Sequence, residues 1–166
     1  MSKQDLINGA YKTAKPKKLS EVEAYKLRRL VRIAKKIFPV TWGKVDNFFV
    51  YKRKDCENDW SAFCTADRKN GRAVIGISDS ALNDHETALS NLLHELAHVI
   101  EPKHTTTFLR ILRWMIRKLE IETGVFISLG DEEVRYNLSD ALAGCRLKVS
   151  GLERFDNCPR LVKIYR

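Results

Sequence analysis

The chain has 166 residues, of which 44% are hydrophobic and 31% are charged. This length suits one domain, and the composition excludes a disordered protein. No apolar run approaches the ~18 residues of a membrane span, and the polar start is unlike a signal peptide, so we expect a cytoplasmic protein with no membrane contact. The 30 Lys and Arg residues outnumber the 21 Asp and Glu residues, and the resulting charge of +9 favours a polyanionic partner, most often nucleic acid.

The first segments of the chain are an arm and a helix. Residues 1–19 are rich in lysine around Pro16, which predicts a loose basic N-terminal arm before a single domain over 20–166. Ser20 and Glu23 form a capping box, so a helix is expected to begin there and to end before Pro39. Its core-facing residues recur every three or four positions: Leu27, Leu30, Val31, Ala34 and Ile37.

The next region changes to the two-residue period of strands. Segments 48–51, 61–65 and 73–77 are rich in aromatic and β-branched residues and are separated by polar turns, which predicts a small sheet of three or so strands. Asn83 and Glu86 resemble a second capping box, which opens a helix that runs to about Ile100 and stops before Pro102. The pattern of helices and a small sheet predicts an α+β fold.

The last predicted elements follow that proline. A helix is expected from about Thr105 to Ile121, with Gly124 as its C-terminal cap. Residues 132–143 have a weaker helical pattern within a C-terminal extension over 125–166. Four cysteines lack the short spacing of zinc knuckles, and we expect free thiols: Cys56, Cys64, Cys145 and Cys158.

Three of the four histidines fall in the segment HELAHVIEPKH, which runs from His94 to His104. His94 and His98 are one helical turn apart, so they project side by side and can share one metal ion. A turn at Pro102 can bring His104 to the same ion. Three imidazoles leave a fourth tetrahedral position open, which is typical of catalytic rather than structural zinc sites. A set of solvated surface histidines is the alternative interpretation.

Glu95 directly follows the first of these histidines, beside the metal rather than on it. From there its carboxylate can take a proton from a bound water. The side of this helix opposite the histidines is apolar, and it consists of Leu89, Leu92, Leu96 and Ile100. The helix is therefore expected to present its histidines to a cleft.

With Phe108 four residues beyond His104, this segment resembles the zinc-dependent SprT-like and WLM peptidases. In that family H-E-L-x-H is followed by a third histidine and an aromatic residue. The resemblance continues loosely upstream, at residues 42–43, 61–64 and 75–78, and it spans about residues 22–120. It implies a zincin-like fold with an N-terminal helix, a small sheet, a metal-binding helix and a packing helix.

The same resemblance implies hydrolysis of peptide bonds at one catalytic Zn²⁺, with His94, His98 and His104 as ligands and Glu95 as the catalytic residue. Members of the group are associated with proteins crosslinked to DNA, so it implies a protein substrate on DNA, in agreement with the net charge. The chain departs from the group because its cysteine spacing does not match a C-terminal zinc ribbon. A metzincin is disfavoured because Glu101 replaces the turn glycine.

Nucleic-acid contact is expected on two basic helix faces, with ordinary solvated faces as the alternative. The first stripe consists of Arg28, Arg32, Lys35 and Lys36, and the second of Arg110, Arg113 and Arg117. The aromatic residues Trp42, Tyr51 and Trp60 could stack on unpaired bases or line the core and the cleft. Arg135 and Tyr136 are candidate donors to an oxyanion, although nothing in the sequence selects them.

Other functions fit the same motif. A peptidase dedicated to one partner, as in a bacteriophage or mobile element, would need no accessory domain. The spacing H-x3-H-x5-H also resembles that of YbeY-like metal-dependent ribonucleases, which lack a general-base glutamate after the first histidine. A non-catalytic, zinc-stabilised DNA-binding protein is a third possibility. The presence of Glu95 favours peptide hydrolysis.

Overall fold

The computed structural model describes residues 1–124. The sequence-based predictions for Arg135, Tyr136, Cys145, Cys158 and a helix over 132–143 lie outside the described residues. The elements follow in the order α1 (Lys3–Thr13), α2 (Glu21–Ile37), α3 (Pro39–Trp42), β1 (Val45–Tyr51), a 3-10 turn η1 (Arg53–Asp55), β2 (Ala62–Asp67), β3 (Arg72–Ser78), α4 (Asp79–Asn83), α5 (His85–Ile100) and α6 (Thr106–Thr123).

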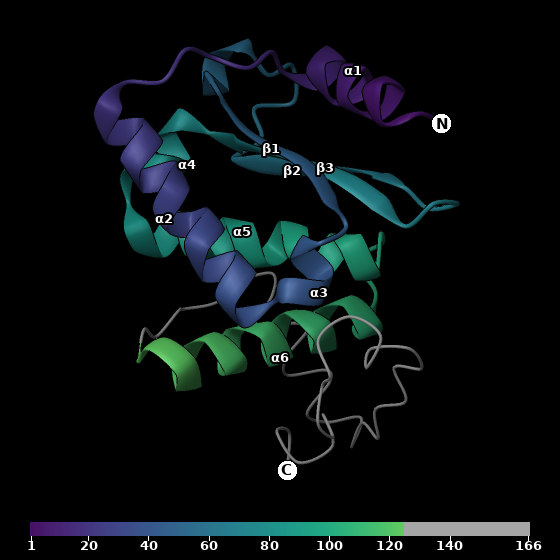
Figure 1. Cartoon of the computed structure of the whole chain (residues 1–166), viewed down its shortest axis with the longest axis vertical. Coiled ribbons are helices and arrows are strands. Elements are labelled where there is room, and N and C mark those ends of the chain that lie inside the picture. The colour runs from purple at the N-terminus through teal and green to yellow at the C-terminus, as the bar shows by residue number, and fades with distance from the viewer. Residues whose placement is uncertain (125–166) are drawn as a thin grey trace.

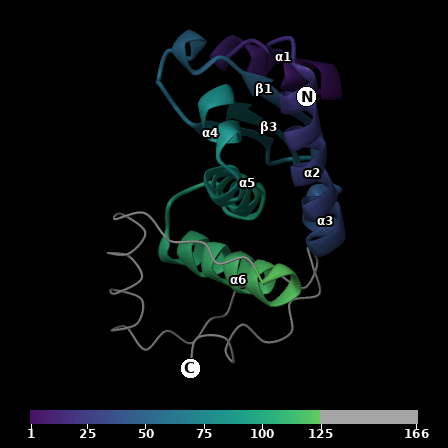
Figure 2. The same ribbon diagram turned by 90° about the vertical axis from the view of Figure 1, so that its left-hand side faces the viewer.

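The elements are stacked in layers, with α1 on one side of the sheet, α5 on the other side and α6 beyond α5 (Figure 1). The view turned by 90° shows α5 end-on between the sheet and α6, with α2 alongside (Figure 2). The α+β class predicted from the sequence is confirmed, as is a sheet of three strands. Within the described part of the chain, no helix is both long and apolar enough to cross a bilayer.

The sheet is mixed, with strand order β1-β3-β2. β1 pairs in parallel with β3, whereas β2 pairs with β3 as an antiparallel hairpin, so β2 lies at the edge of this sheet. The hairpin turn contains Gly71 at φ 61°, a left-handed conformation that glycine adopts without strain. A glycine is also required at Gly76, because a Cβ there would lie 2.7 Å from the Phe63 ring.

The two faces of the sheet belong to two hydrophobic cores, because strand side chains alternate between faces. The larger core joins β1 and β3 to α2, α5 and α6, and its members include Val50, Ile75, Ile77, Leu30, Leu92, Leu96 and Trp114. The smaller core lies between the sheet and α1, and it consists of Leu6, Ala10, Ala14, Phe49, Tyr51, Cys56, Phe63 and Val74. The sheet is therefore covered on both faces.

The prediction of a loose arm over residues 1–19 is wrong. Residues 3–13 form α1, whose N-terminus is held by a capping box between Ser2 and Asp5. Leu6 is only 1% exposed, so the helix is anchored by its apolar side. The segment after α1 is also tied to the domain, because Lys17 donates its backbone N–H to Val50 and pairs with Glu23 at 2.8 Å. Lys12 lies on the exposed side of α1, and Lys15, Lys17 and Lys18 follow the helix.

The predicted helix boundaries are confirmed for α2 and α6 and shifted for α5. Ser20 and Glu23 form the expected capping box, and Gly124 caps α6 in the left-handed conformation. The predicted cap at Asn83 is wrong, because α4 ends there and the side chain of Asp84 accepts from Thr87 to start α5.

Candidate metal centre

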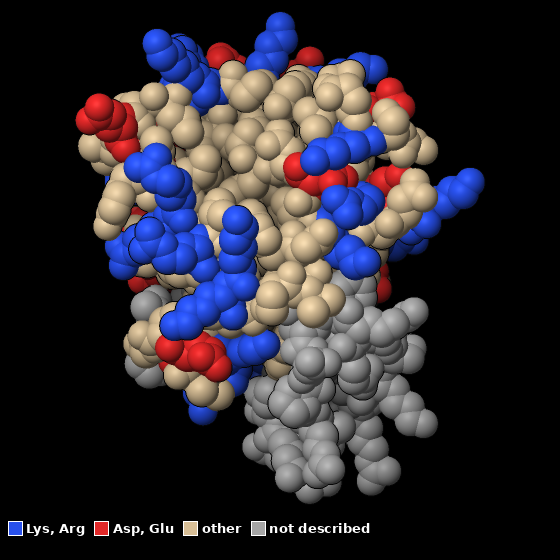
Figure 3. Space-filling view, viewed as in Figure 1, with Lys and Arg blue, Asp and Glu red and all other residues tan. Residues whose placement is uncertain are grey.

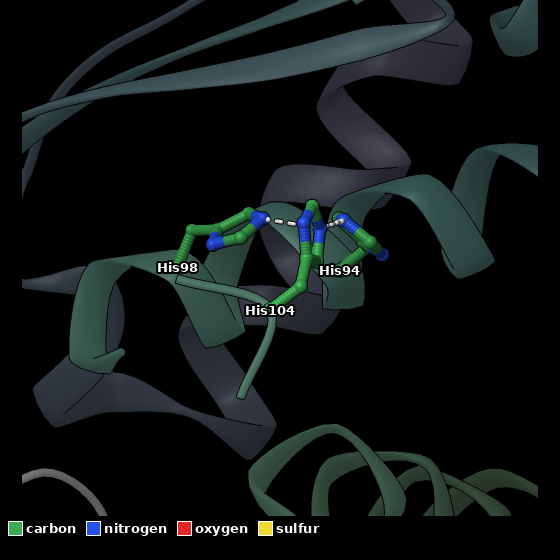
Figure 4. Close-up of side chains that lie close together, drawn as sticks. All are labelled: His94, His98 and His104. Carbon is green, nitrogen blue, oxygen red and sulfur yellow. Dashed lines mark hydrogen bonds between the residues drawn. The ribbon is translucent and has the colours of Figure 1, made fainter. Parts of the chain in front are cut away.

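The three histidines predicted from the sequence converge at the C-terminal end of α5 (Figure 4). His94 and His98 lie one turn apart on α5, and His104 returns from the connection that leads to α6. The Nε2 atom of His104 lies 3.0 Å from Nε2 of His94 and 3.1 Å from Nε2 of His98. The turn at Pro102 therefore does what the sequence predicts.

These nitrogen positions fit a single metal ion. One ring nitrogen of each histidine lies within 4.8 Å of the other two. Nitrogens bound to one tetrahedral ion at the usual zinc distance lie ~3.3 Å apart, close to the two separations observed here. The three histidines can therefore bind a metal ion.

The backbone after α5 fixes the orientation of one ligand. Nδ1 of His98 lies 3.1 Å from the carbonyl oxygen of Glu101, and since a carbonyl can only accept, Nδ1 carries the proton. This tautomer leaves the lone pair of Nε2 directed at His104 and available to a metal. Burial and the neighbouring charge of His94 lower the pKa of His98 from 6.5 to about 4, so the imidazole is neutral at physiological pH, as metal binding requires.

Phe108 forms the floor beneath the three imidazoles. It is fully buried in the first turns of α6, and its ring centroid lies 4.9 Å from those of both His94 and His104. The N-cap Thr105 accepts from the backbone N–H of Phe108 and so starts α6 directly after the last histidine. The packing of α5 against α6 therefore determines where the histidines lie.

Glu95 lies beside the histidines in a buried position. Glu95 is only 5% exposed. This burial raises the pKa of its carboxyl group from 4.5 to about 7, and the neighbouring His94 opposes the rise. A carboxyl group with a pKa near neutrality can both accept and return a proton at physiological pH. Glu95 lines the same groove as the three histidines.

A groove lies in front of this site and has a volume of about 460 Å³. We call it the histidine groove, because His94, His98, His104 and Glu95 line one side of it. Its other side is formed by β2 and the residues that flank that strand: Trp60, Ala62, Phe63, Cys64, Ala66 and Arg68. The volume lies in the range of small-molecule and peptide-side-chain pockets, so the histidines face an accessible cavity.

The two predicted basic stripes differ in exposure. Arg28, Arg32, Lys35 and Lys36 are all exposed on α2, and Figure 3 shows basic side chains gathered over this helix. On α6, Arg110 and Arg113 are partly buried, and Arg117 pairs with Glu120 at 3.4 Å. The second stripe is therefore only partly exposed.

The exposed basic face of α2 and the histidines lie on opposite sides of α5. Figure 1 shows α2 in front of α5, whereas the purple helix lies behind α5 when the histidines are viewed in Figure 4. The aromatic residues are also separated: Tyr51 is buried, Trp42 packs against Phe48 at 5.7 Å, and Trp60 lines the histidine groove. Tyr51 is therefore not available to stack on bases.

Several features of the site are absent from the sequence interpretation. Glu101 acts on His98 through its backbone carbonyl, which the sequence does not indicate. The sequence also does not show that β2 forms a wall of the groove, because that depends on how the strand packs against α5. The free thiols predicted for Cys56 and Cys64 are confirmed, and Cys64 lines the groove, where burial raises the pKa of its thiol. The sequence does indicate Phe108, because its spacing from His104 forms part of the motif.

Comparison with known proteins gives no match to a protein-family model, a curated protein or a solved structure.

Proposed function

We propose that the protein is a zinc metallopeptidase with a zincin-like domain. The observation that carries this proposal is the buried Glu95 beside three convergent histidines in an open groove. A purely structural zinc site needs four protein ligands, whereas this cluster offers three among the described residues. Three imidazoles favour zinc over magnesium or calcium, which prefer oxygen ligands.

In this proposal His94, His98 and His104 hold the ion. When bound, zinc supplies Lewis-acid chemistry, since it polarises a carbonyl group and lowers the pKa of a bound water. Glu95 accepts the proton of the attacking water and returns it to the amine nitrogen of the leaving peptide. The carbonyl of Glu101 keeps His98 in the tautomer that binds the ion, and Phe108 holds the imidazoles in place.

The lining of the histidine groove favours a protein over a nucleic acid as the substrate. Of the described residues that line it, Arg68 is the only Arg, and none is a Lys. A groove that binds RNA or DNA would be expected to carry several cations along the phosphate backbone. This observation favours the peptidase over a YbeY-like ribonuclease.

The exposed basic face of α2 supports binding of DNA at a surface away from the groove, where DNA is not the substrate. Because this face lies across α5 from the histidines, DNA bound to it leaves the groove open for a protein. We therefore propose that the substrates are proteins associated with, or crosslinked to, DNA. A dedicated processing peptidase has the same groove and differs in using a single substrate.

The test is a cleavage assay on a basic DNA-binding protein, with and without single-stranded DNA, after the enzyme is loaded with zinc. Glu95→Gln should keep zinc and lose cleavage, whereas His98→Ala should lose both. His85→Ala is the matched control, because His85 lies at the start of the same helix and outside the cluster. Zinc binding without any cleavage would favour the non-catalytic DNA-binding alternative, and cleavage of RNA would favour the ribonuclease.

A further inference from the structure

The wall of the histidine groove opposite the histidines follows one regular pattern along β2. Within β2, Ala62, Cys64 and Ala66 line the groove, because alternate side chains of an extended strand share a face, and Phe63 is also part of the lining. Trp60 precedes the strand and Arg68 follows it, and both line the groove as well. The row consists of Trp60, Ala62, Cys64, Ala66 and Arg68. A large aromatic residue and a cation therefore stand at the two ends of three small side chains.

We infer that the histidine groove selects extended peptides with a large apolar side chain on one side of the cleaved bond and an acidic side chain on the other. Trp60 recognises the apolar side chain and Arg68 the acidic one. This inference names the substrate class of the proposed peptidase and therefore rests on that proposed function.

The centre of the row is the point closest to the chemistry. Cys64 lies in the middle of this row, and Glu95 lines the facing side of the same groove. Ala62 and Ala66 flank Cys64, and their small side chains leave space for a peptide between β2 and α5. The bond to be cleaved would then lie near the middle of the row, with Trp60 and Arg68 on either side.

Trp60 is held in place although it is half exposed. Its residue is 47% exposed, yet its carbonyl oxygen accepts from the buried Tyr51 hydroxyl at 2.6 Å. Its ring contacts that of Phe63, with the centroids 6.3 Å apart. An aromatic side chain that is anchored from behind and open toward a cavity provides a preformed apolar contact, since little side-chain entropy remains to be lost on binding.

Arg68 is the only Arg or Lys that lines the groove within residues 1–124. No hydrogen bond or ion pair holds its guanidinium to another residue in the range 1–124. The neighbouring Asp67 points away from the groove, and its carboxylate accepts from Asn70 at 2.6 Å. Figure 1 shows the β2–β3 turn at the same end as the C-terminus of α5, so this charge lies on the His98 side of the site. A guanidinium without a protein partner favours a carboxylate from the substrate.

The backbone of β2 also suits an extended ligand. β2 is the edge strand and pairs only with β3 among the described elements, so its outer edge can add a peptide strand. The eight-residue step from Trp60 to Arg68 spans at most ~27 Å at the rise of an extended chain. A peptide of eight to ten residues is long enough to reach both ends.

The experiment measures peptide binding separately from cleavage. Zinc-loaded Glu95→Gln protein is incubated with a random library of ten-residue peptides, and the bound peptides are identified by mass spectrometry. We expect peptides with Asp or Glu on one side and a large apolar residue on the other to be enriched about fivefold over those with Lys, as an exposed ion pair of ~1 kcal/mol implies. Absence of this enrichment would overturn the inference.

Matched variants assign the two preferences. Arg68→Glu should reverse the acidic preference, and Arg68→Gln should abolish it without adding a charge. Lys69→Glu makes the same change of charge one residue away and outside the groove, so it should leave the preference intact. Trp60→Ala should remove only the apolar preference, whereas Tyr25→Ala, at another exposed aromatic residue, should not. An equal effect of Lys69→Glu and Arg68→Glu would also overturn the inference.

The enriched peptides are then offered to the zinc-loaded wild-type protein. Binding with the expected preference but no cleavage contradicts the proposed peptidase and leaves the recognition by Trp60 and Arg68 supported. Cleavage without an acidic preference contradicts the inference and supports the peptidase. The two failures are therefore distinguishable.

Discussion

The ring of Phe108 lies stacked on the imidazole of His98, with the ring centroids 4.4 Å apart and the planes 27° from parallel. The two residues come from consecutive helices, so the stack connects α6 to the C-terminal end of α5. An imidazole held on one face by an aromatic ring and on one edge by a backbone carbonyl has little freedom to rotate. We expect this restraint to contribute to metal affinity.

Phe108→Leu should therefore weaken zinc binding about tenfold while the fold is retained, because leucine fills the core but cannot stack on His98. The measurement is a competition titration with a chromophoric zinc chelator. Ile111→Val is the control: it removes one methylene from the same buried face of α6 and should cost about 1 kcal/mol of stability with unchanged zinc affinity. Equal zinc affinities of Phe108→Leu and the wild type would contradict a role for the stack.

Glu95→Gln should stabilise the metal-free protein at high pH and not at low pH. The folded-state pKa of Glu95 is raised from 4.5 to about 7, so above pH 7 the folded protein carries a buried charge that the unfolded chain solvates freely. Stability of the wild type therefore falls as the pH rises from 4.5 to 7. We expect Glu95→Gln to be more stable by about 3 kcal/mol at pH 8 and nearly equal at pH 4.

Urea unfolding of both chelator-treated proteins at the two pH values tests this expectation. A stability difference that is the same at pH 4 and pH 8 would exclude ionisation of Glu95 as its cause.

Gly76→Ala should destabilise the sheet. A Cβ at this position would lie 2.7 Å from Phe63 and 3.2 Å from Phe49, so two buried aromatic rings would have to move. Overpacking of this kind costs about 2 kcal/mol. Gly9→Ala is the opposite case, since its Cβ on α1 meets nothing within 4 Å, and it should stabilise by about 0.5–1 kcal/mol. Thermal unfolding of both variants would show shifts of opposite sign.

Leu6→Ala should destabilise the domain by about 3 kcal/mol, the usual cost of truncating a fully buried leucine. The reason is that α1 belongs to the packed core rather than to a mobile arm. Lys12→Ala, on the exposed side of the same helix, should change stability by less than about 0.5 kcal/mol. Similar denaturant midpoints for Leu6→Ala and the wild type would restore the interpretation of a loose arm.

DNA binding should depend on α2 and weaken steeply with salt. Replacing Arg28, Arg32, Lys35 and Lys36 by Gln should reduce affinity for single-stranded DNA and lower the slope of log affinity against log salt by about 3 units, because about four phosphate contacts are lost. Fluorescence anisotropy between low and physiological salt measures both quantities. Affinity that does not change with salt would contradict the proposed DNA contact.

The helices whose ends carry strong local signals are those that the sequence predicts well. Ser20 with Glu23 and Thr105 with Gly124 are local, so α2 and α6 begin and end as expected. The start of α5 was predicted one residue early, because Asn83 and Asp84 are both good capping residues and only the end of α4 distinguishes them. The prediction of an arm fails because the many lysines hide a helix that is anchored by only two buried residues, Leu6 and Ala10, and capped by Ser2 and Asp5.

The histidine cluster is predictable because its three members lie within one helix and the following turn. The spacing from His94 to His98 defines one helical face, and Pro102 defines where the chain must leave it. The row from Trp60 to Arg68 was not predictable, because its place opposite Glu95 depends on how a distant strand packs across α5. Sequence periodicity identifies the strand but not the helix residue that it faces.

The edge strand β2 separates the smaller hydrophobic core under α1 from the histidine groove. Phe63 belongs to the core under α1 and also reaches the lining of the histidine groove, which its neighbours Ala62 and Cys64 line as well. Because both faces belong to one strand, a change in the packing of Phe63 against α1 would also move the wall of the groove near Trp60. Of the described residues that line the groove, none comes from α1, yet α1 packs against the strand that forms one of its walls.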